Sequence, residues 1–119
     1  MNELELKLCD IQGRLFELSG AKGYDSATFI KAFMISQVAA DMDKEFHHVQ
    51  WAGKAYILSR MEDELADQLT KDGEIYDKET LYWMGYIYRY WNFYTGENSR
   101  EIYKQAPAKT MKVVYLMYH

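Results

Sequence analysis

Residues 78–94 read Lys78-Glu-Thr-Leu-Tyr-Trp-Met-Gly-Tyr-Ile-Tyr-Arg-Tyr-Trp-Asn-Phe-Tyr94, and eight of these seventeen side chains are aromatic. Side chains three and four residues apart lie on one face of an α-helix, so this segment carries two apolar stripes. One stripe is Trp83, Tyr86, Tyr90 and Tyr94, and the other is Leu81, Met84, Tyr88 and Trp91. A helix that is apolar on nearly all sides is normally buried by several neighbours. We therefore expect residues 78–95 to form the central helix of a small bundle.

The residues around this segment indicate where helices begin and end. Asp77 is a favourable N-cap for the aromatic helix, and Gly96 suits the left-handed conformation that often follows a helix. Asn98 and Glu101 have the spacing of a capping box, so a short helix is expected next. Pro107 ends that helix and can begin a last one. The apolar stripe expected for this last helix is Met111, Val114 and Leu116.

The first part of the chain also has helical periodicity. Apolar side chains recur at steps of three and four residues in a first seam, which consists of Leu4, Leu8, Ile11, Leu15 and Leu18. Gly20 and Gly23 suit the end of this helix, and Asp25 or Ser26 suits the cap of the next. The longest periodic segment spans residues 46–69, and residues 41–48 fit either a bend or a continued helix. The expected fold is all-α, with five or six helices in one domain over residues 1–119.

Composition is that of an ordinary globular protein, with 49% hydrophobic and 27% charged residues. The single cysteine, Cys9, excludes an internal disulfide and is expected in the core, which fits a reducing cytoplasm. No apolar run approaches the ~18 residues that a membrane helix requires, and the acidic N-terminus lacks the apolar region of a signal peptide. We therefore expect a cytoplasmic protein that does not bind membranes.

Acidic residues exceed basic ones in the body of the chain, whereas its end is basic. Residues 1–84 hold 9 Lys or Arg against 16 Asp or Glu, a balance of −7, and residues 85–119 hold 5 against 2, a balance of +3, which together give the net charge of −4. The electrostatic potential of the chain would therefore attract an anionic partner only at the C-terminal end.

The sequence offers little that could support catalysis. Asp43 and His47 share a face if the chain is helical there, but one carboxylate and one imidazole are too few ligands for a tight metal site, and His48 points elsewhere. Paired carboxylates occur in an acidic cluster, Glu62, Asp63, Glu64 and Asp67, which is also typical of a solvated helix face. The sequence contains neither the Gly-x-Ser-x-Gly motif of a nucleophile elbow nor a phosphate-binding glycine loop. We expect a non-enzymatic protein without a cofactor or metal, and keep a metal-dependent enzyme as a remote alternative.

Tyrosine, tryptophan and arginine are enriched at protein-binding hot spots, and the aromatic helix contains all three. Core packing accounts for most of its rings, but eight are many for one helix of a small bundle. The expected partner face consists of Tyr86, Arg89, Tyr90 and Tyr94. It would bind another protein or a second copy of the chain.

A DNA-binding regulator is the main alternative. Two short helices joined at Ala106-Pro107 resemble a helix-turn-helix in outline, although proline replaces the usual glycine-type turn. The residues that would contact nucleic acid are Arg100, Lys104, Lys109 and Lys112.

Several segments together resemble a group of small helical proteins of Gram-positive gut bacteria: Tyr24-Asp25-Ser26, residues 29–34, Gln50-Trp51-Ala52-Gly53, residues 82–91, residues 94–99 and Glu101-Ile102-Tyr103. Members of that group are often encoded beside genes proposed to form toxin–antitoxin pairs. The resemblance implies an antitoxin-like or regulatory role with a toxin as partner, and it transfers no catalytic or binding residue. Members of the group extend past Tyr118-His119, which implies that this chain is short at its C-terminus.

Overall fold

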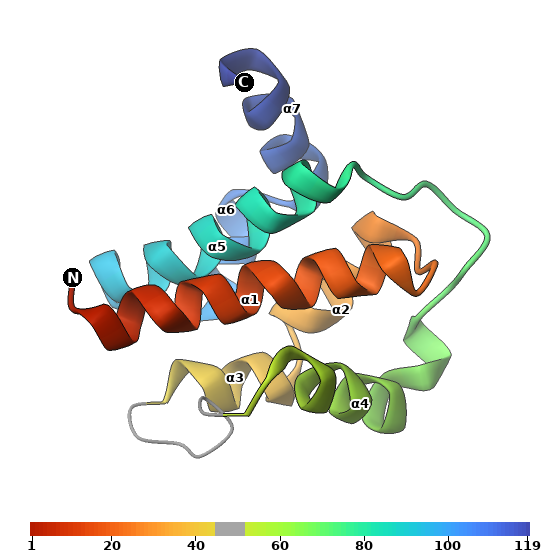
Figure 1. The fold of residues 1–119 in the computed structure, drawn as a ribbon, viewed down its shortest axis with the longest axis horizontal. Coiled ribbons are helices and arrows are strands. Elements are labelled where there is room, and N and C mark those ends of the chain that lie inside the picture. The colour runs from red at the N-terminus through yellow and green to blue at the C-terminus, as the bar shows by residue number, and fades with distance from the viewer. Residues whose placement is uncertain (45–51) are drawn as a thin grey trace.

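The computed structural model describes residues 1–44 and 52–119. All regular secondary structure in these residues is helical, which confirms the all-α prediction, with seven α-helices in place of five or six. In chain order the elements are α1 (Glu3–Ala21), α2 (Ser26–Met34), α3 (Gln37–Asp43), α4 (Lys54–Leu65), the short 3-10 helix η2 (Ala66–Gln68), α5 (Lys78–Thr95), α6 (Ser99–Gln105) and α7 (Ala108–Tyr118). Figure 1 shows their arrangement.

The helices α1 and α5 run antiparallel and pack closely along their length (Figure 1). Two glycines make this close approach possible. A Cβ atom on Gly85 would lie 2.5 Å from the Gln12 carbonyl oxygen, and one on Gly13 would lie 2.8 Å from the Tyr82 carbonyl oxygen. The backbones of the two helices therefore touch at a crossing where no larger residue fits.

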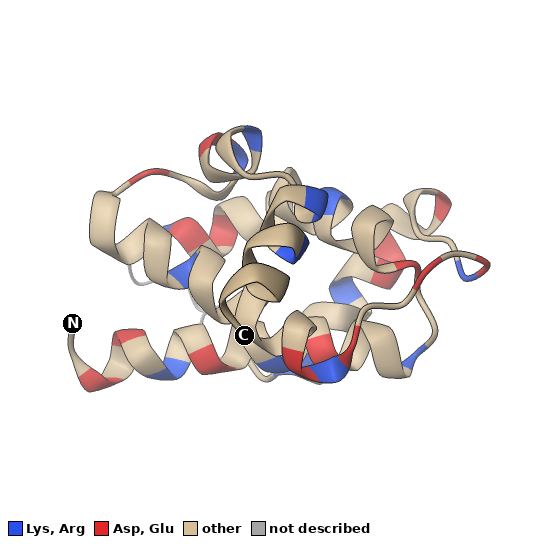
Figure 2. Ribbon diagram, turned by 90° about the horizontal axis from the view of Figure 1, so that it is seen from above, with Lys and Arg blue, Asp and Glu red and all other residues tan. Residues whose placement is uncertain are grey.

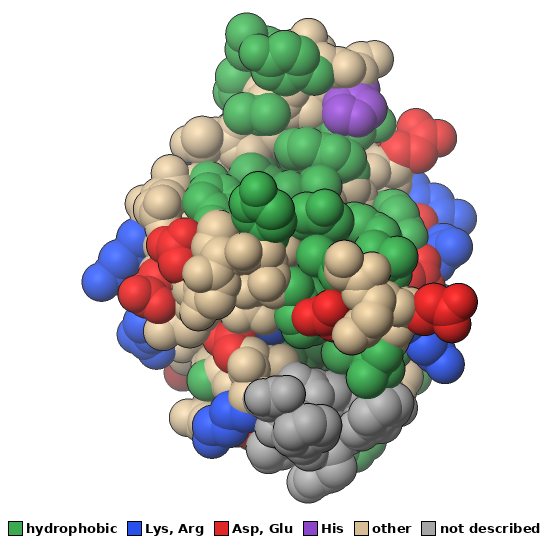
Figure 3. All heavy atoms as spheres, turned by 90° about the vertical axis from the view of Figure 1, so that its left-hand side faces the viewer, with side chains coloured by type: hydrophobic (Ala, Val, Ile, Leu, Met, Phe, Trp, Pro, Cys, Tyr) green, Lys and Arg blue, Asp and Glu red, His purple; other side chains and the backbone are tan. Residues whose placement is uncertain are grey.

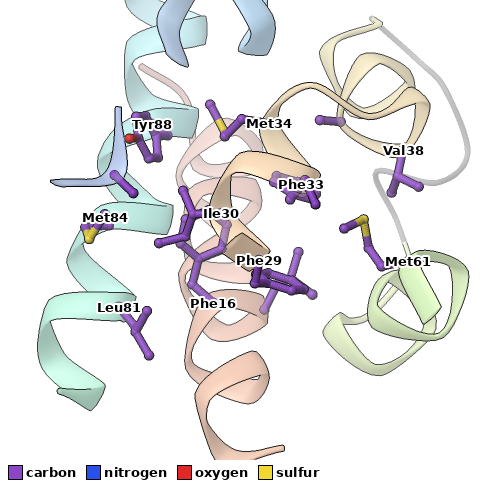
Figure 4. Packing of buried hydrophobic residues seen from close by; sticks show 14 of the residues in the cluster. Phe16, Phe29, Ile30, Phe33, Met34, Val38, Met61, Leu81, Met84 and Tyr88 are labelled. Carbon is purple, nitrogen blue, oxygen red and sulfur yellow. The ribbon is translucent and has the colours of Figure 1, made fainter. Parts of the chain in front are cut away.

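The core lies between this helix pair, α2, α3 and α4, and α2 supplies several of its fully buried side chains. Phe29, Ile30 and Phe33 of α2 have no exposed surface. Phe16 of α1 meets Phe29 and Phe33 edge-on, with ring centroids 6.1 and 5.7 Å apart, and Tyr88 of α5 reaches the same ring at 6.3 Å. Figure 4 shows the side chains from α1, α2 and α5 pointing toward one another, with Val38 of α3 and Met61 of α4 on the other side of α2. Edge-to-face contacts of this kind stabilise aromatic cores beyond the area they bury.

Most helix ends lie where their capping residues predict. Asn98 and Glu101 form the expected capping box at α6, with Glu101 N donating to the Asn98 side chain at 2.8 Å. Asp25 caps α2, and Gly96 follows α5 with φ +80°. Gly20 lies inside α1, whereas Gly23 lies after it with φ +86°.

Two helices differ from what periodicity predicts. α3 includes residues 41–43, and α4 begins at Lys54 after Gly53, so the expected helix over residues 46–69 is shorter at its start; residues 45–51, including Trp51, lie outside the described part. The second difference concerns α7. Met111 is buried as expected, but Val114 and Leu116 are exposed, because α7 projects from the globule and only one of its sides meets the core (Figure 1).

Candidate functional site

The two apolar stripes of α5 have different surroundings. Leu81, Met84 and Tyr88 face the core and are at most 1% exposed. The opposite stripe becomes more exposed along the helix. Trp83 at its start is half-buried, whereas the side chain of Tyr94 at its end is exposed to solvent. The sequence predicts both stripes, but only the first is enclosed by other helices. α5 is therefore a helix with one buried side and one accessible side.

Arg89 of α5 lies in the interior, where its guanidinium is surrounded by polar groups from four helices. It is 1% exposed. Its Nη1 donates to Asp43 Oδ1 of α3 at 2.7 Å and to Asn92 Oδ1 at 3.1 Å, and its Nε donates to Gln12 Oε1 of α1 at 2.8 Å. Nη2 lies 3.4 Å from Ser99 Oγ of α6. Burial lowers the pKa of Arg89, and the Asp43 carboxylate opposes that effect.

The acceptors of this cation are themselves held in place. Asp43 also accepts hydrogen bonds from the Ser99 backbone N–H at 2.9 Å and from its hydroxyl at 2.7 Å. Gln12 donates through Nε2 to the Gly85 carbonyl at 3.0 Å, and Asn92 donates to the Glu97 carbonyl at 2.7 Å. A network in which each member is satisfied orders the elements that contribute to it. The network therefore fixes α5 relative to α1, α3 and α6.

This placement corrects the expected partner face. Arg89 was expected there with Tyr86, Tyr90 and Tyr94, because helical spacing puts it beside them. Its side chain instead points inward, where Gln12 and Asp43 compensate its charge. The sequence gives one hint of this network, a glutamine at position 12 within an apolar helix face. The long-range partners, Asp43 and Ser99, have no local signal.

The three tyrosines occupy the accessible side of α5. Tyr90 is 38% exposed and Tyr94 is 79% exposed, and their rings are stacked with centroids 6.3 Å apart and planes inclined by 20°. Tyr86 is half-buried, and its ring lies 5.9 Å from that of Tyr82. Partial burial raises the pKa of Tyr86 above its ordinary value. We call Tyr86, Tyr90 and Tyr94 the tyrosine face.

The antiparallel pairing of α1 and α5 places the first turns of α1 at the same end of the molecule as the last turns of α5 (Figure 1). Leu4 and Leu6 in these turns are each 38% exposed. Figure 3 views this end and shows hydrophobic side chains gathered in a continuous band across it. Contiguous apolar surface on a soluble domain is typical of interaction sites.

The basic residues of the DNA-binding alternative differ in their surroundings. Arg100 donates to the Ile35 carbonyl at 2.5 Å, and Lys112 pairs with Glu74 at 2.6 Å. Lys104 and Lys109 are exposed, on α6 and on the first turn of α7. Figure 2 shows Lys and Arg interspersed with Asp and Glu over the described chain. Two of the four residues therefore have partners within the chain, and the four are divided between α6 and α7.

Several of the residues considered for a metal site have other partners. Asp43 is engaged by Arg89 and Ser99, and His47 and His48 lie outside the described residues. In the acidic cluster, Glu62 accepts a hydrogen bond from the Tyr24 hydroxyl at 2.5 Å, and Glu64 pairs with Arg60 at 2.8 Å. No group of three or more His, Cys, Asp or Glu side chains in residues 1–44 and 52–119 is placed to hold a metal ion.

Grooves lie on the surface of the described residues. The first, about 610 Å³, lies between α2 and the start of α7 and is lined by Lys31, Tyr103 and Lys109 among others. The second, about 520 Å³, lies over the end of α1 and the start of α5, near Arg14, Lys54 and Lys78. The third, about 330 Å³, includes Asp43 and Arg100. None of them includes a residue of the tyrosine face.

Among the helices described, none has the length and apolar character needed to span a bilayer.

Comparison with protein-family models, with curated protein sequences and with solved structures finds no match to this chain.

Proposed function

We propose that this chain is a non-enzymatic cytoplasmic protein-binding module whose partner docks on the tyrosine face. The observation that supports this most is the stacked pair of Tyr90 and Tyr94, which lies on the accessible side of α5. Tyrosine is among the residues enriched at binding hot spots, since its ring buries a large area and its hydroxyl can still form a hydrogen bond.

The support beneath the tyrosine face strengthens this proposal. α5 is fixed to α1 at the crossing of Gly13 and Gly85, and to α1, α3 and α6 through Arg89. Binding loses less entropy when the contacting groups are already held in place. Each tyrosine has only two side-chain torsions to order, and the mutual stacking of Tyr90 and Tyr94 restricts them before a partner arrives.

Charges near this face indicate the chemistry of the partner. Glu3 and Glu5 lie in the first turn of α1, and Glu97 follows α5. Hydrogen bonds from Trp91 and Gln105 lower the pKa of Glu97, because they favour its charged form. A partner with an apolar centre and basic residues around it would complement this surface. The resemblance to proteins encoded beside toxin genes makes a small toxin our first candidate, which gives the module an antitoxin-like or regulatory role.

Affinity capture with matched variants tests the proposal. The tagged wild-type chain, Tyr90→Ala, Tyr94→Ala and the double variant are used to capture proteins from the lysate of cells that carry the native gene neighbourhood. Tyr56→Ala is the control, because Tyr56 is also an exposed tyrosine, 50% accessible, but lies on α4. We expect one partner in stoichiometric amount with wild type and with Tyr56→Ala, and its loss with the double variant.

Circular dichroism of each variant shows whether the fold is intact before capture is compared. Capture of the same amount of partner by the double variant and by wild type would show that the interface lies elsewhere on the protein. Capture of no stoichiometric partner by the folded wild-type chain would remove the proposal.

A further inference from the structure

The groove between α2 and the start of α7 has a volume of about 610 Å³, which is typical of small-molecule sites. Short apolar side chains form part of its lining. Ala32 and Ala108 are buried there, and Ala27 and Ile35 are half-buried beside them. Pro107 continues this lining at the joint between α6 and α7. Because these side chains are short, they leave room for a flat apolar group. We call this site the α2–α7 groove.

Hydrogen-bond donors from four elements line the same groove. Lys31 of α2 and Lys109 of α7 are exposed cations, and each can donate through its ammonium group. Tyr103 of α6 adds a phenol, and Gln68 of η2 adds an amide. In the part of the chain that the structure describes, none of these four side chains forms an ion pair or a hydrogen bond. The fold therefore leaves four donors at one groove without using them.

The charge of the α2–α7 groove is positive. Lys31 and Lys109 line it, and none of the described residues in its lining is Asp or Glu. The Asp25 carboxylate interacts with the charge of Lys109 from outside the lining. Both of its oxygens, however, accept hydrogen bonds from Thr28 or from the Glu74 backbone. Two cations without an acid in the same groove repel each other, and a bound anion offsets that repulsion.

We propose that the α2–α7 groove binds the phosphate monoester of a small molecule that carries an apolar ring, such as a mononucleotide. A phosphate monoester has about two negative charges at neutral pH and three acceptor oxygens. It therefore matches two cations and two uncharged donors. A carboxylate has a single charge and would leave part of this set unused. Lys31 and Lys109 hold the phosphate in this arrangement, and the ring lies against the alanine side chains near Tyr103.

This site is independent of the tyrosine face, because none of Tyr86, Tyr90 and Tyr94 lines the groove. A small ligand and a protein partner would therefore occupy different surfaces of the molecule. The groove is open to solvent, so it buries only part of a ligand, and we expect a dissociation constant of about 0.1–1 mM.

A titration followed by ¹H–¹⁵N NMR in phosphate-free buffer tests the proposal with three compounds. AMP carries both the phosphate and the ring, adenosine lacks the phosphate, and ribose 5-phosphate lacks the ring. We expect AMP, added from about 0.01 to 10 mM, to shift the backbone signals of Ala27, Lys31 and Lys109. The signals of Tyr90 and Tyr94 should stay in place, because these residues lie on the tyrosine face.

The other two compounds separate the contributions of the phosphate and the ring. Adenosine is expected to bind at least about tenfold more weakly than AMP, because it forms no hydrogen bond between charged groups. Ribose 5-phosphate is expected to bind at least about fivefold more weakly, because it loses the contact between the base and the apolar lining.

Matched lysine variants show which side chains hold the phosphate. Lys31→Gln and Lys109→Gln each remove one cation from the groove, whereas Lys104→Gln removes an exposed cation of α6 that does not line it. All three side chains are exposed, so we expect the fold to remain, and circular dichroism checks this. The dissociation constant for AMP should rise at least about fivefold in each of the first two variants, and it should not change in the third.

Several results would overturn the proposal. One is the absence of shifts in the groove signals at the highest AMP concentration. Equal affinities for AMP and adenosine would show that the phosphate is not recognised, and equal affinities for AMP and ribose 5-phosphate would show that the apolar lining has no role. Unchanged affinity in both Lys31→Gln and Lys109→Gln would contradict the assignment of these cations.

A nucleic-acid surface is the competing explanation for lysines in this region, and the same variants distinguish it. A DNA oligonucleotide would then bind more tightly than AMP, and Lys104→Gln would weaken its binding as much as Lys31→Gln does. That result would assign the lysines to a nucleic-acid backbone and would also overturn the proposal.

Discussion

Arg89 Nη1 lies 2.7 Å from Asp43 Oδ1, and this ion pair joins the middle of α5 to the last residue of α3. The arginine side chain is 1% exposed and that of the aspartate 10%. Removing a cation from water is costly, and the hydrogen bonds that Arg89 donates to Gln12, Asn92 and Ser99 compensate that cost. The pair thus serves to fix the orientation of α5, and with it the direction in which the tyrosine face points.

Replacing the cation tests this role. Arg89→Met keeps much of the side-chain volume but leaves the Asp43 carboxylate without its ion-pair partner in a nearly buried position. Loss of one member of a buried pair costs about 3–5 kcal/mol of unfolding free energy, and urea unfolding measures it. Arg14→Met is the control, because Arg14 pairs with Glu17 on the surface and its side chain is 49% exposed. An unfolding midpoint that falls equally in both variants, or in neither, would refute the structural role of Arg89.

The crossing of α1 and α5 makes a second prediction. Gly85→Ala should destabilise the fold by about 1–3 kcal/mol, because the added methyl group meets the Gln12 carbonyl and the Gly13 Cα, which cannot move separately from α1. Gly20→Ala is the matched control in α1, since its methyl group meets no backbone of another element, only the end of the flexible Leu81 side chain and, in ordinary contact, a methyl group of Ile75. Thermal unfolding of both variants compares them. Equal melting temperatures would show that the helices are less closely packed than described.

The buried thiol makes a third prediction. Burial raises the pKa of Cys9 to about 11 from its ordinary value of 9.0. The thiol of the unfolded chain loses its proton near pH 9, whereas the thiol of the folded chain keeps it up to about pH 11. The contribution of this group to the unfolding free energy is therefore complete below pH 9 and is lost as the pH rises to 11. The unfolding free energy of wild type should therefore fall by about 2–3 kcal/mol relative to Cys9→Ala over this range. A constant difference between the two proteins would contradict the burial of this group.

Local signals predict the ends of the helices well. The capping box at Asn98 and Glu101 and the left-handed Gly96 specify their own backbone conformation through neighbours within a few residues. The presence of α5 also follows from periodicity, and so does the burial of Cys9. The caps and turns among these features depend on interactions along one helix or one turn, which a sequence records directly.

The orientation of each helix in the fold is harder to read. Periodicity gives α5 two apolar stripes, but it does not show which one α1 and α2 will cover. In α7, periodicity predicts that Val114 and Leu116 are buried together with Met111. They are exposed, because α7 meets the body only on the side of Ala108 and Met111. Arg89 is the sharpest case, because its burial depends on Asp43, which is 46 residues away in the chain. Contacts between distant segments leave no local pattern.

The binding free energy of the captured partner tests the central claim most directly. Isothermal titration calorimetry with the purified partner compares wild type, the variant with both Tyr90→Ala and Tyr94→Ala, and the Tyr56→Ala control. Truncation of hot-spot residues costs at least about 2 kcal/mol, so we predict a dissociation constant at least about 30-fold higher for the double variant, and no change for the control. Equal dissociation constants for all three folded proteins would contradict the assignment of the tyrosine face as the binding surface.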